Sequence, residues 1–332
     1  MYTYLYYLKM KRKIIITGGC GFIGSNLAQY LLKKKYEIII IDDMSVGSAK
    51  NIIHFRKKVK LIKINVNKIN KIKKINGNIF ALIHLAAKAE ILISKENENK
   101  YYDDNVNSVM QVLNFSQRNK IKRIIFASSA SIYGDTKNFK VNENFKLKPG
   151  HFYAFTKYIG EKMIRSDCNI NSIKYTIMRF FNIYGPGSTA VIGRFIAQKI
   201  QKKKLTIYGN GNQKRDFLYV EDLCEAIHLS LKKKISENKI YNLGSGKAKS
   251  INEIKNIISK KNFVNLVKRN DDIEVSISDN KRIKKELKWK NKTNLEKGIN
   301  SIFISDFDNL KKLKFKSISQ QEKIIKKFNL KK

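Results

Sequence analysis

The sequence is poor in proline, in cysteine and in acidic side chains. Its 332 residues include only two prolines and three cysteines, and they contain no run of about 18 apolar residues, the length that a membrane-spanning helix requires. We therefore expect no membrane span. An odd number of widely separated cysteines argues against a disulfide framework and favours a reducing compartment, so a cytoplasmic protein is expected. The four scattered histidines have no metal-ligand spacing, so no metal is expected.

Acidic residues are heavily outnumbered by basic ones. The chain has 68 Lys and Arg against 27 Asp and Glu, which gives a formal net charge of +41. The lysines run through nearly every segment, whereas a nucleic-acid binder concentrates them on one patch or helix. Because Lys, Asn and Ile share A/T-rich codons, we interpret much of the charge as a composition bias and expect no specific nucleic-acid partner. The charge should still favour an anionic substrate.

The glycine-rich stretch T-G-G-C-G-F-I-G at Thr17–Gly24 dominates the first part of the chain. It follows the apolar run 14–16, which predicts a buried strand, and precedes a segment with helical apolar spacing. A strand, a glycine loop and a helix in this order are typical of a dinucleotide-binding site. Gly18 would permit a tight turn, Gly21 would let the backbone approach a pyrophosphate, and Gly24 would let the helix pack closely on the strand.

Apolar runs recur at regular intervals and predict further buried strands. They cover 37–42, 59–64, 79–85, 121–127 and 173–181, and a long helix is expected over 101–119. This alternation predicts an α/β fold with a doubly wound, Rossmann-type parallel sheet. Asp42 ends the second strand, 18 residues after Gly24. A carboxylate there would bind the adenosine ribose and repel a 2′-phosphate, so NAD is expected in preference to NADP.

Hydroxyl groups gather after the fifth strand, in S-S-A-S-I-Y-G at Ser128–Gly134. Shortly afterwards Tyr153 opens a helix that has Lys157 four positions later, so the lysine would lie beside the phenol. A nearby ammonium favours the phenolate and would lower the pKa of Tyr153 toward neutrality, as a general base requires. The same spacing recurs elsewhere in this lysine-rich chain, and the nearest decoy is Tyr158 with Lys162.

The second half of the chain changes character. A loop is expected over Asn182–Gly187, and the acidic pair Glu221-Asp222 is expected to begin a helix. We expect three parts: an NAD-binding Rossmann domain over 1–182, a smaller, mainly substrate-binding α/β cap over 183–311 with some chain returning to the Rossmann domain, and a basic C-terminal tail over 312–332. Residues 1–10 lack the pattern of a signal peptide, and a start at Met10 would make 1–9 an extension.

Seven segments, in this order, resemble the extended short-chain dehydrogenase/reductase family, in particular its nucleotide-sugar epimerases and dehydratases. The resemblance runs from about residue 12 to residue 290 and is closest to the UDP-glucose 4-epimerase type. Its segments are Thr17–Gly24, Asp42, His84–Ala87 (H-L-A-A), Ser128–Gly134, Tyr153 with Lys157, Arg179–Pro186 (R-F-F-N-I-Y-G-P) and Arg215–Asp222 (R-D-F-L-Y-V-E-D).

The resemblance implies NAD as the cofactor and assigns roles to individual residues. Tyr153 would be the general base, Lys157 would bind the nicotinamide ribose, and Ser129 would be the catalytic hydroxyl. The substrate would be bound by Ser129, Asn182, Arg215, Arg269 and Asp272. The cofactor would be bound by Gly18, Gly21, Phe22, Ile23, Gly24, Asp42, Asn65, Val66, Leu85, Ala86, Ala87, Tyr153, Lys157 and Phe181.

The sequence departs from the family pattern at two places. R-N-D-D at Arg269–Asp272 stands where the family has R-P-G-D, which leaves open the roles of Arg269 as a phosphate ligand and Asp272 as a ribose ligand. Asn65 stands where the family has Asp near the adenine. An amide can still form a hydrogen bond there, so the cofactor is expected nevertheless.

The residues between Ser129 and Tyr133 bear on the reaction. Family dehydratases carry acids there and decarboxylases a Glu, whereas this chain has Ala130 and Ser131. This favours NAD-dependent epimerisation at C4 of a UDP-sugar through a transient 4-keto intermediate, in a role such as cell-surface polysaccharide biosynthesis. A 4,6-dehydratase, a UDP-glucuronate decarboxylase and, in another class, a non-catalytic nucleotide- or RNA-binding protein remain alternatives. The resemblance also implies a homodimer formed through helices at 101–119 and 153–165.

Overall fold

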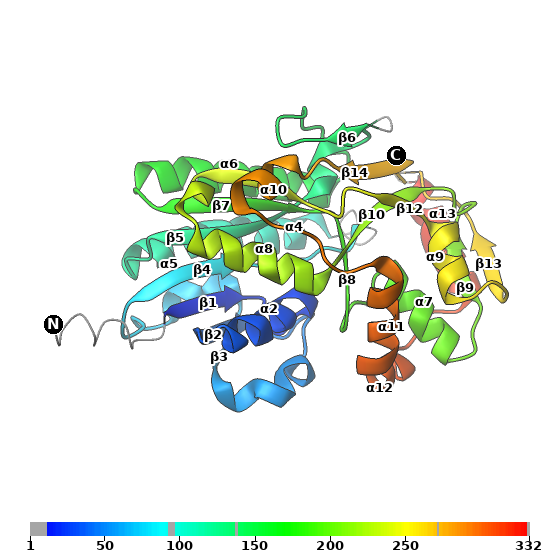
Figure 1. Ribbon diagram of the computed structural model, residues 1–332, viewed down its shortest axis with the longest axis horizontal. Coiled ribbons are helices and arrows are strands. Elements are labelled where there is room, and N and C mark those ends of the chain that lie inside the picture. The colour runs from blue at the N-terminus through cyan, green and yellow to red at the C-terminus, as the bar shows by residue number, and fades with distance from the viewer. Residues whose placement is uncertain (1–11, 92–96, 137–138, 271, 331–332) are drawn as a thin grey trace.

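A seven-stranded parallel sheet forms the centre of the larger part of the molecule (Figure 1). The computed structural model describes residues 12–91, 97–136, 139–270 and 272–330. Its main sheet has the strand order β11-β7-β5-β4-β1-β2-β3. The strands are β1 (Lys13–Thr17), β2 (Glu37–Asp42), β3 (Val59–Lys63), β4 (Ile79–His84), β5 (Arg123–Ser129), β7 (Lys174–Phe180) and β11 (Lys239–Leu243). This confirms the predicted α/β fold with a doubly wound parallel sheet.

Isoleucine alternation explains why the sheet is buried on both faces. Ile14 and Ile16 belong to the apolar cluster on one face, and Ile15 belongs to the cluster on the other. All three are fully buried. Since successive side chains of a strand point to opposite faces, an unbroken apolar run can serve only a strand that is covered on both sides.

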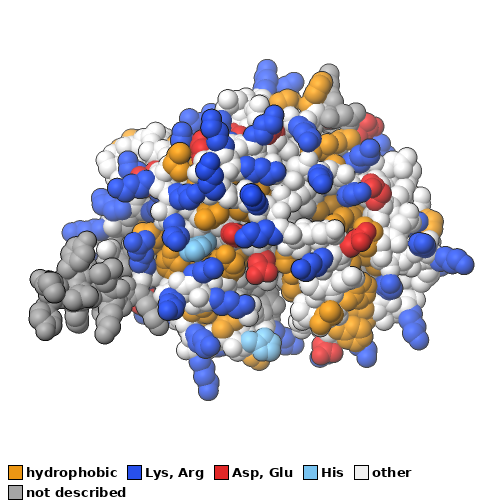
Figure 2. Space-filling model, viewed as in Figure 1, with side chains coloured by type: hydrophobic (Ala, Val, Ile, Leu, Met, Phe, Trp, Pro, Cys, Tyr) orange, Lys and Arg blue, Asp and Glu red, His pale blue; other side chains and the backbone are white. Residues whose placement is uncertain are grey.

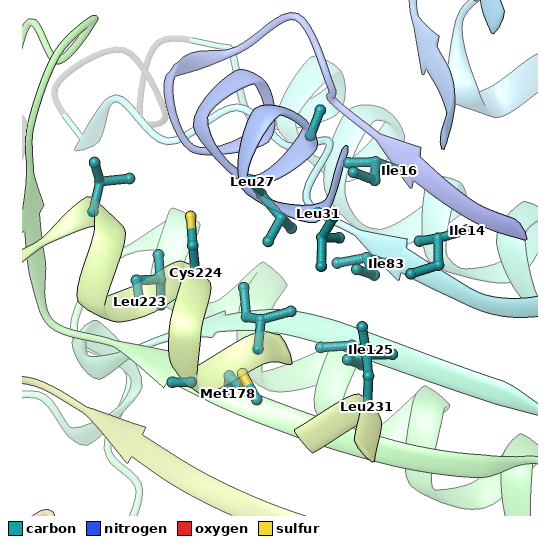
Figure 3. Close-up of a cluster of buried hydrophobic side chains, with 14 of the residues drawn as sticks. Ile14, Ile16, Leu27, Leu31, Ile83, Ile125, Met178, Leu223, Cys224 and Leu231 are labelled. Atoms are coloured by element: carbon teal, nitrogen blue, oxygen red, sulfur yellow. The ribbon is translucent and has the colours of Figure 1, made fainter. Parts of the chain in front are cut away.

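Helices supply that cover. On one face α2 (Phe22–Lys33) lies against α8 (Val220–Lys232). Figure 3 shows Leu27 and Leu31 of α2 directed into the same apolar cluster as Ile83 of β4. The other face is covered by α5 (Ser108–Arg118) and α6 (Phe152–Ile170), which pack against β5 and β7. Each large apolar side chain buried in this way contributes about 1.5–3 kcal/mol.

The single helix predicted over 101–119 is interrupted. A wider π-helical turn, η3 (Asp103–Asn107), joins α4 (Glu98–Tyr102) to α5. The turn directs Asn105 inward, where its amide exchanges two hydrogen bonds with the Lys88 backbone, of 2.8 and 3.0 Å, and donates a third, of 3.0 Å, to Thr156 of α6. Satisfying that buried amide explains a turn that helical periodicity alone does not predict.

A smaller α/β cap follows. Its larger sheet has the order β12-β10-β14-β6 with β8 beside β10, and its smaller sheet pairs β13 with β9. The strands are β6 (Lys140–Val141), β8 (Asn182–Tyr184), β9 (Leu205–Tyr208), β10 (Lys214–Tyr219), β12 (Ala248–Ser250), β13 (Phe263–Leu266) and β14 (Val275–Ser278). The helices after β8, apart from α8, are α7 (Val191–Ile200), α9 (Ile251–Ile258), α10 (Lys281–Leu287), α11 (Leu295–Ser305), α12 (Phe307–Lys311) and α13 (Ile318–Leu330). Short 3-10 turns are η1 (Ala49–Lys58), η2 (Val66–Lys71), η4 (Ala130–Tyr133) and η5 (Lys234–Ser236).

The expected loop over Asn182–Gly187 is wrong in its first half. Asn182–Tyr184 is a strand, because Phe217–Tyr219 of β10 offers it a parallel partner in the register Asn182↔Phe217. The chain also passes more than once between the main sheet and the cap. β6 adds to the cap sheet, whereas β11 is the edge strand of the main sheet.

Lysine and arginine side chains are spread over the whole of the face in Figure 2, with acidic side chains among them, and do not gather over one element. Within the described ranges no helix is both long enough and apolar enough to cross a bilayer.

Candidate active site

The glycine loop connects the carboxyl end of β1 to α2, beside the point where the sheet order reverses. Gly18 has a φ of +71°, and a Cβ there would lie 2.8 Å from the Ala86 nitrogen. A Cβ on Gly24 would lie 2.1 Å from the Gly18 carbonyl oxygen. Gly21 precedes α2 without a side-chain cap. The first-turn N–H groups of α2 are therefore open to an anion.

Asp42 fastens this loop to the end of β2. One of its carboxylate oxygens accepts a hydrogen bond of 2.8 Å from the Cys20 N–H, and the other accepts one of 2.7 Å from the Met44 N–H. Burial raises the pKa of Asp42, and these two N–H groups oppose the shift. The carboxylate thus shapes the loop and retains further acceptor capacity toward the cavity, since each oxygen has two lone pairs.

A second carboxylate, Asp43, pairs with Asn65 at the same end of the site. Its Oδ2 accepts 2.6 Å from the Asn65 amide nitrogen and its Oδ1 accepts 2.9 Å from the Ser45 N–H. Burial would raise the pKa of Asp43, but the bonds from Ser45 and Asn65 and the charge of Lys88 outweigh it and lower the pKa. This end of the site therefore holds one carboxylate, that of Asp43, and one amide, that of Asn65.

A cavity of about 480 Å³ opens over the glycine loop. Every residue that the sequence assigns to the cofactor lines it, from Gly18 to Phe181. Other residues that line the cavity were not predicted from the sequence. Asp43 and Lys88 directly follow Asp42 and the H-L-A-A segment, which could have pointed to them. The loop 187–190 after β8 had no such sequence signal. An open helix N-terminus, a close-approach glycine loop and a strand-end carboxylate that line one cavity fit a dinucleotide.

Ser129, Tyr153 and Lys157 converge on the same cavity. Ser129 ends β5 and Tyr153 lies in the first turn of α6. Burial raises the pKa of Tyr153, and a hydrogen bond with Ser129 opposes the shift. The Lys157 Nζ donates 2.8 Å to the Ala127 carbonyl oxygen.

The expected lowering of the Tyr153 pKa by Lys157 is therefore wrong. The ammonium is directed at the β5 backbone, and burial outweighs the Ser129 hydrogen bond at the phenol. Burial also lowers the pKa of Lys157 to about 8, against the opposing effect of Glu161.

His84 lies beneath the site. Its Nδ1 is 2.7 Å from the Thr17 hydroxyl, which in turn accepts a hydrogen bond of 3.4 Å from the Ala86 N–H. Burial, with a smaller contribution from the charge of Lys157, lowers the pKa of His84 to about 3. A neutral imidazole that joins β4 to β1 is a structural group, as its place at the end of a buried strand predicts.

A buried network holds α6 against the sheet. Arg179 of β7 makes two hydrogen bonds to the Glu161 carboxylate, of 2.9 and 2.8 Å. Arg179 also donates 2.9 Å to the Tyr133 hydroxyl, which donates 2.6 Å to the Asn242 side-chain oxygen. The network links the helix that carries Tyr153, the turn after Ser129 and strand β11.

The other predicted substrate residues lie apart from this cavity. Asp272 forms an ion pair with Arg215 and accepts 3.1 Å from the Gln213 amide. It lines a second cavity, of about 580 Å³, together with Tyr208 and Lys268. The Asn182 amide is directed at the Asp216 carbonyl oxygen, 3.5 Å away.

Asp216 belongs to the sequence segment Arg215–Asp222, and the structure gives its side chain a joining role. Its fully buried carboxylate accepts hydrogen bonds from the backbone and hydroxyl of Ser245, both 2.6 Å, and from the Gly246 N–H, 3.0 Å. It also accepts from the backbone and hydroxyl of Ser278, at 3.0 and 2.6 Å. Asp216 thus joins β10 to the turn after β11 and to β14.

Comparison with known proteins places these features in context. The sequence model of the "NAD dependent epimerase/dehydratase family" matches residues 14–244. A putative UDP-glucose 4-epimerase of Methanocaldococcus jannaschii is 34% identical over 252 residues, which cover 74% of this chain and 81% of that protein. A UDP-N-acetyl-alpha-D-glucosaminuronate decarboxylase of Bacillus cytotoxicus is 31% identical over 255 residues, covering 74% of this chain and 78% of that protein.

Solved structures agree with the sequence comparison. The crystal structure of UDP-glucose 4-epimerase from Thermotoga maritima, determined with UDP-glucose, superposes with a TM-score of 0.83. The two chains are 27% identical, and the match covers 90% of this chain and 99% of the other.

Proposed function

Since this chain belongs to the NAD-dependent epimerase/dehydratase family, we propose that it interconverts the C4 epimers of a UDP-sugar through a transient 4-keto intermediate. The chain is an enzyme of that family and its cofactor is NAD. The observation that carries the finer proposal is the meeting of Ser129, Tyr153 and Lys157 in the cavity above the glycine loop.

The cofactor, when bound, supplies a hydride acceptor that also returns the hydride, so no external oxidant is consumed. In our proposal the Tyr153 oxygen takes the proton from the 4-hydroxyl of the sugar, and Ser129 hydrogen-bonds to the same sugar oxygen. Lys157 binds the nicotinamide ribose and, once turned from the Ala127 carbonyl, brings a positive charge near the phenol. That charge would favour the phenolate and counter the raised pKa of Tyr153.

The absence of an acid between Ser129 and Tyr133 supports epimerisation over elimination. Ala130 and Ser131 occupy that 3-10 turn, and the Ser131 hydroxyl donates 3.0 Å to the Ser129 oxygen. Neither side chain can protonate a leaving hydroxyl as a carboxylic acid would.

We propose that the UDP-sugar phosphates are bound on the cap side, by Arg215 and Arg269, with Asp272 at the ribose and Asn182 nearby. The Arg215–Asp272 pair beside the second cavity supports this placement. A guanidinium forms two parallel hydrogen bonds to a phosphate, which suits Arg215 to that role.

Product analysis tests the proposal. The protein is incubated with UDP-glucose, UDP-N-acetylglucosamine and UDP-glucuronate, and the products are separated by chromatography and identified by NMR. C4 epimers at unchanged mass are expected for at least one sugar. Loss of carbon dioxide would assign a decarboxylase, loss of water a 4,6-dehydratase, and no turnover together with salt-sensitive RNA binding a non-catalytic protein.

We also propose a homodimer formed through α5 and α6. Tyr102 of α4, Met110 of α5 and Phe155 of α6 leave 43%, 44% and 42% of their surface exposed. These helices pack on one another, and exposed apolar side chains on helices that pack together suit a protein interface. Sedimentation equilibrium should give twice the chain mass, and Phe155→Glu should give the monomer.

A further inference from the structure

The tail expected over 312–332 contains a helix with one contacting face. In α13, Gln321, Ile325 and Asn329 are spaced four residues apart, so they lie on one side of the helix. Ile325 is 1% exposed, whereas Lys323, Lys326 and Lys327 are exposed. α13 packs on β13, at the end of the cap that Figure 1 shows on the right.

Both ends of that face reach residues beside the second cavity. Gln321 lies 3.5 Å from the Tyr208 hydroxyl. Asn329 accepts 3.0 Å from the Asn270 N–H through its side-chain oxygen and donates 2.9 Å from its amide nitrogen to the Lys268 carbonyl oxygen. Its own carbonyl oxygen accepts 3.3 Å from the Asn270 amide.

These bonds act where the sequence departs from its family. A proline at position 270 would fix the backbone by its ring and would have no N–H to donate. Asn270 lacks that constraint, and its N–H is bonded to Asn329 instead. Arg269, within the segment so held, accepts a hydrogen bond of 3.3 Å from the Asp272 N–H through its carbonyl oxygen.

We propose that α13 is a positioning element: through Asn329 it fixes the Lys268–Asn270 segment, and so holds Asp272 against Arg215 in the geometry that receives the diphosphate and ribose of the nucleotide sugar. This inference rests on the proposed function, because that function gives Arg215 and Asp272 their ligand. Asn329 is a positioning residue, since it acts through Asn270 and Asp272 and lies outside the two cavities as described.

The alternative is that α13 only covers apolar surface, with Ile325 as its anchor. In that case Asn329→Ala would alter neither nucleotide affinity nor catalysis. A positioning role predicts a change confined to the nucleotide sugar, because the glycine loop and Tyr153 belong to the other part of the molecule.

The test is isothermal titration of the full chain with UDP and, separately, with NAD. Removing the two side-chain hydrogen bonds of Asn329 should weaken UDP binding by about fivefold to 140-fold, since each is worth about 0.5–1.5 kcal/mol and 1.4 kcal/mol is tenfold. NAD affinity should stay within twofold. With a turned-over sugar, KM should rise by a similar factor while kcat changes by less than twofold.

Three further proteins complete the experiment. Lys326→Ala, on the exposed side of α13, is the matched control and should behave as the wild type. Asn329→Asp keeps the acceptor for Asn270 and should fall between wild type and Asn329→Ala. A chain ending at Ser317 should lose at least as much UDP affinity as Asn329→Ala.

Equal UDP affinities of wild type and Asn329→Ala would overturn the inference while leaving the proposed function intact. A parallel loss of NAD affinity would also overturn it, because the effect would then be general. A wild type that does not bind UDP at all would overturn the proposed function, and the inference with it.

Discussion

Arg179 and Glu161 form a bidentate ion pair inside the protein, with side chains only 3% and 4% exposed. Arg179→Met should lower the free energy of unfolding by about 3–5 kcal/mol, because it leaves a buried carboxylate unpaired. The double variant Arg179→Met/Glu161→Leu should lose less, since neither charge then remains. Urea denaturation measures both, and a double variant as unstable as the single one would contradict this account.

Tyr153 and Tyr158 offer a matched pair on one helix. Tyr153→Phe should lower kcat by about 10²–10⁴-fold, as expected for loss of a general base, and should leave NAD binding within about twofold. Tyr158→Phe should retain near-normal turnover, although Tyr158 has the same spacing to a lysine and Lys162 lies 5.3 Å from its ring. Steady-state rates on the preferred nucleotide sugar decide between the two tyrosines.

Gly24 and Gly150 test the glycine loop. Gly24→Ala should abolish measurable NAD binding and destabilise the fold by about 1–3 kcal/mol, because its Cβ would lie 2.1 Å from a carbonyl oxygen. Gly150→Ala is the control, since its Cβ would meet nothing within 4 Å. Thermal unfolding with and without NAD should show a ligand-induced shift in the control and none in Gly24→Ala.

The Asp43–Asn65 contact predicts a swap experiment. Asn65→Asp would place two carboxylates at a 2.6 Å contact, which should cost about 2 kcal/mol of stability at neutral pH and weaken NAD binding. Asp43→Asn combined with Asn65→Asp restores one carboxylate and one amide, and should recover most of both losses. Additive losses in the double variant would show that the pair is not coupled.

His84 predicts an acid-dependent loss of stability. Its pKa is about 3 in the folded protein, against 6.5 for an ordinary histidine. The unfolded chain therefore binds a proton between these values that the folded chain does not, so stability is full above about pH 6.5 and falls as the pH is lowered. The part due to His84 is about 2 kcal/mol between pH 7 and 5. Urea denaturation across this range should give a flatter profile for His84→Gln, and identical slopes would contradict the assignment.

Apolar runs in the sequence predicted six of the seven strands of the main sheet, all but β11, and the glycine loop predicted residues that line the cavity. An unbroken run of isoleucines fits only a strand that is covered on both faces. At Gly18 and Gly24 a Cβ would collide with neighbouring backbone atoms, and Asp42 binds the backbone of the glycine loop, so these three residue types could be interpreted from the sequence. Partners distant in sequence were harder to predict. β8 is a strand only because β10 lies beside it, and the π-helical turn at Asp103–Asn107 exists to satisfy Asn105.

Side-chain direction was likewise beyond the sequence. The four-residue spacing places Lys157 on the face of Tyr153, yet its ammonium is directed at the Ala127 carbonyl, and Arg215 is paired with Asp272. The sequence analysis treated 312–332 only as a basic tail, because lysines dominate it. It did not predict that Gln321, Ile325 and Asn329 lie on one side of a helix.

Asp216 has a consequence for how ligands come and go. The single carboxylate of Asp216 binds Ser245, Gly246 and Ser278, and so joins β10 and β14 of the cap to the turn after β11 of the main sheet. A movement of the cap that separates β10 from the turn after β11 would have to break the bonds of Asp216 to Ser245 and Gly246 together, so we expect the two parts to keep their placement at this point when a ligand binds.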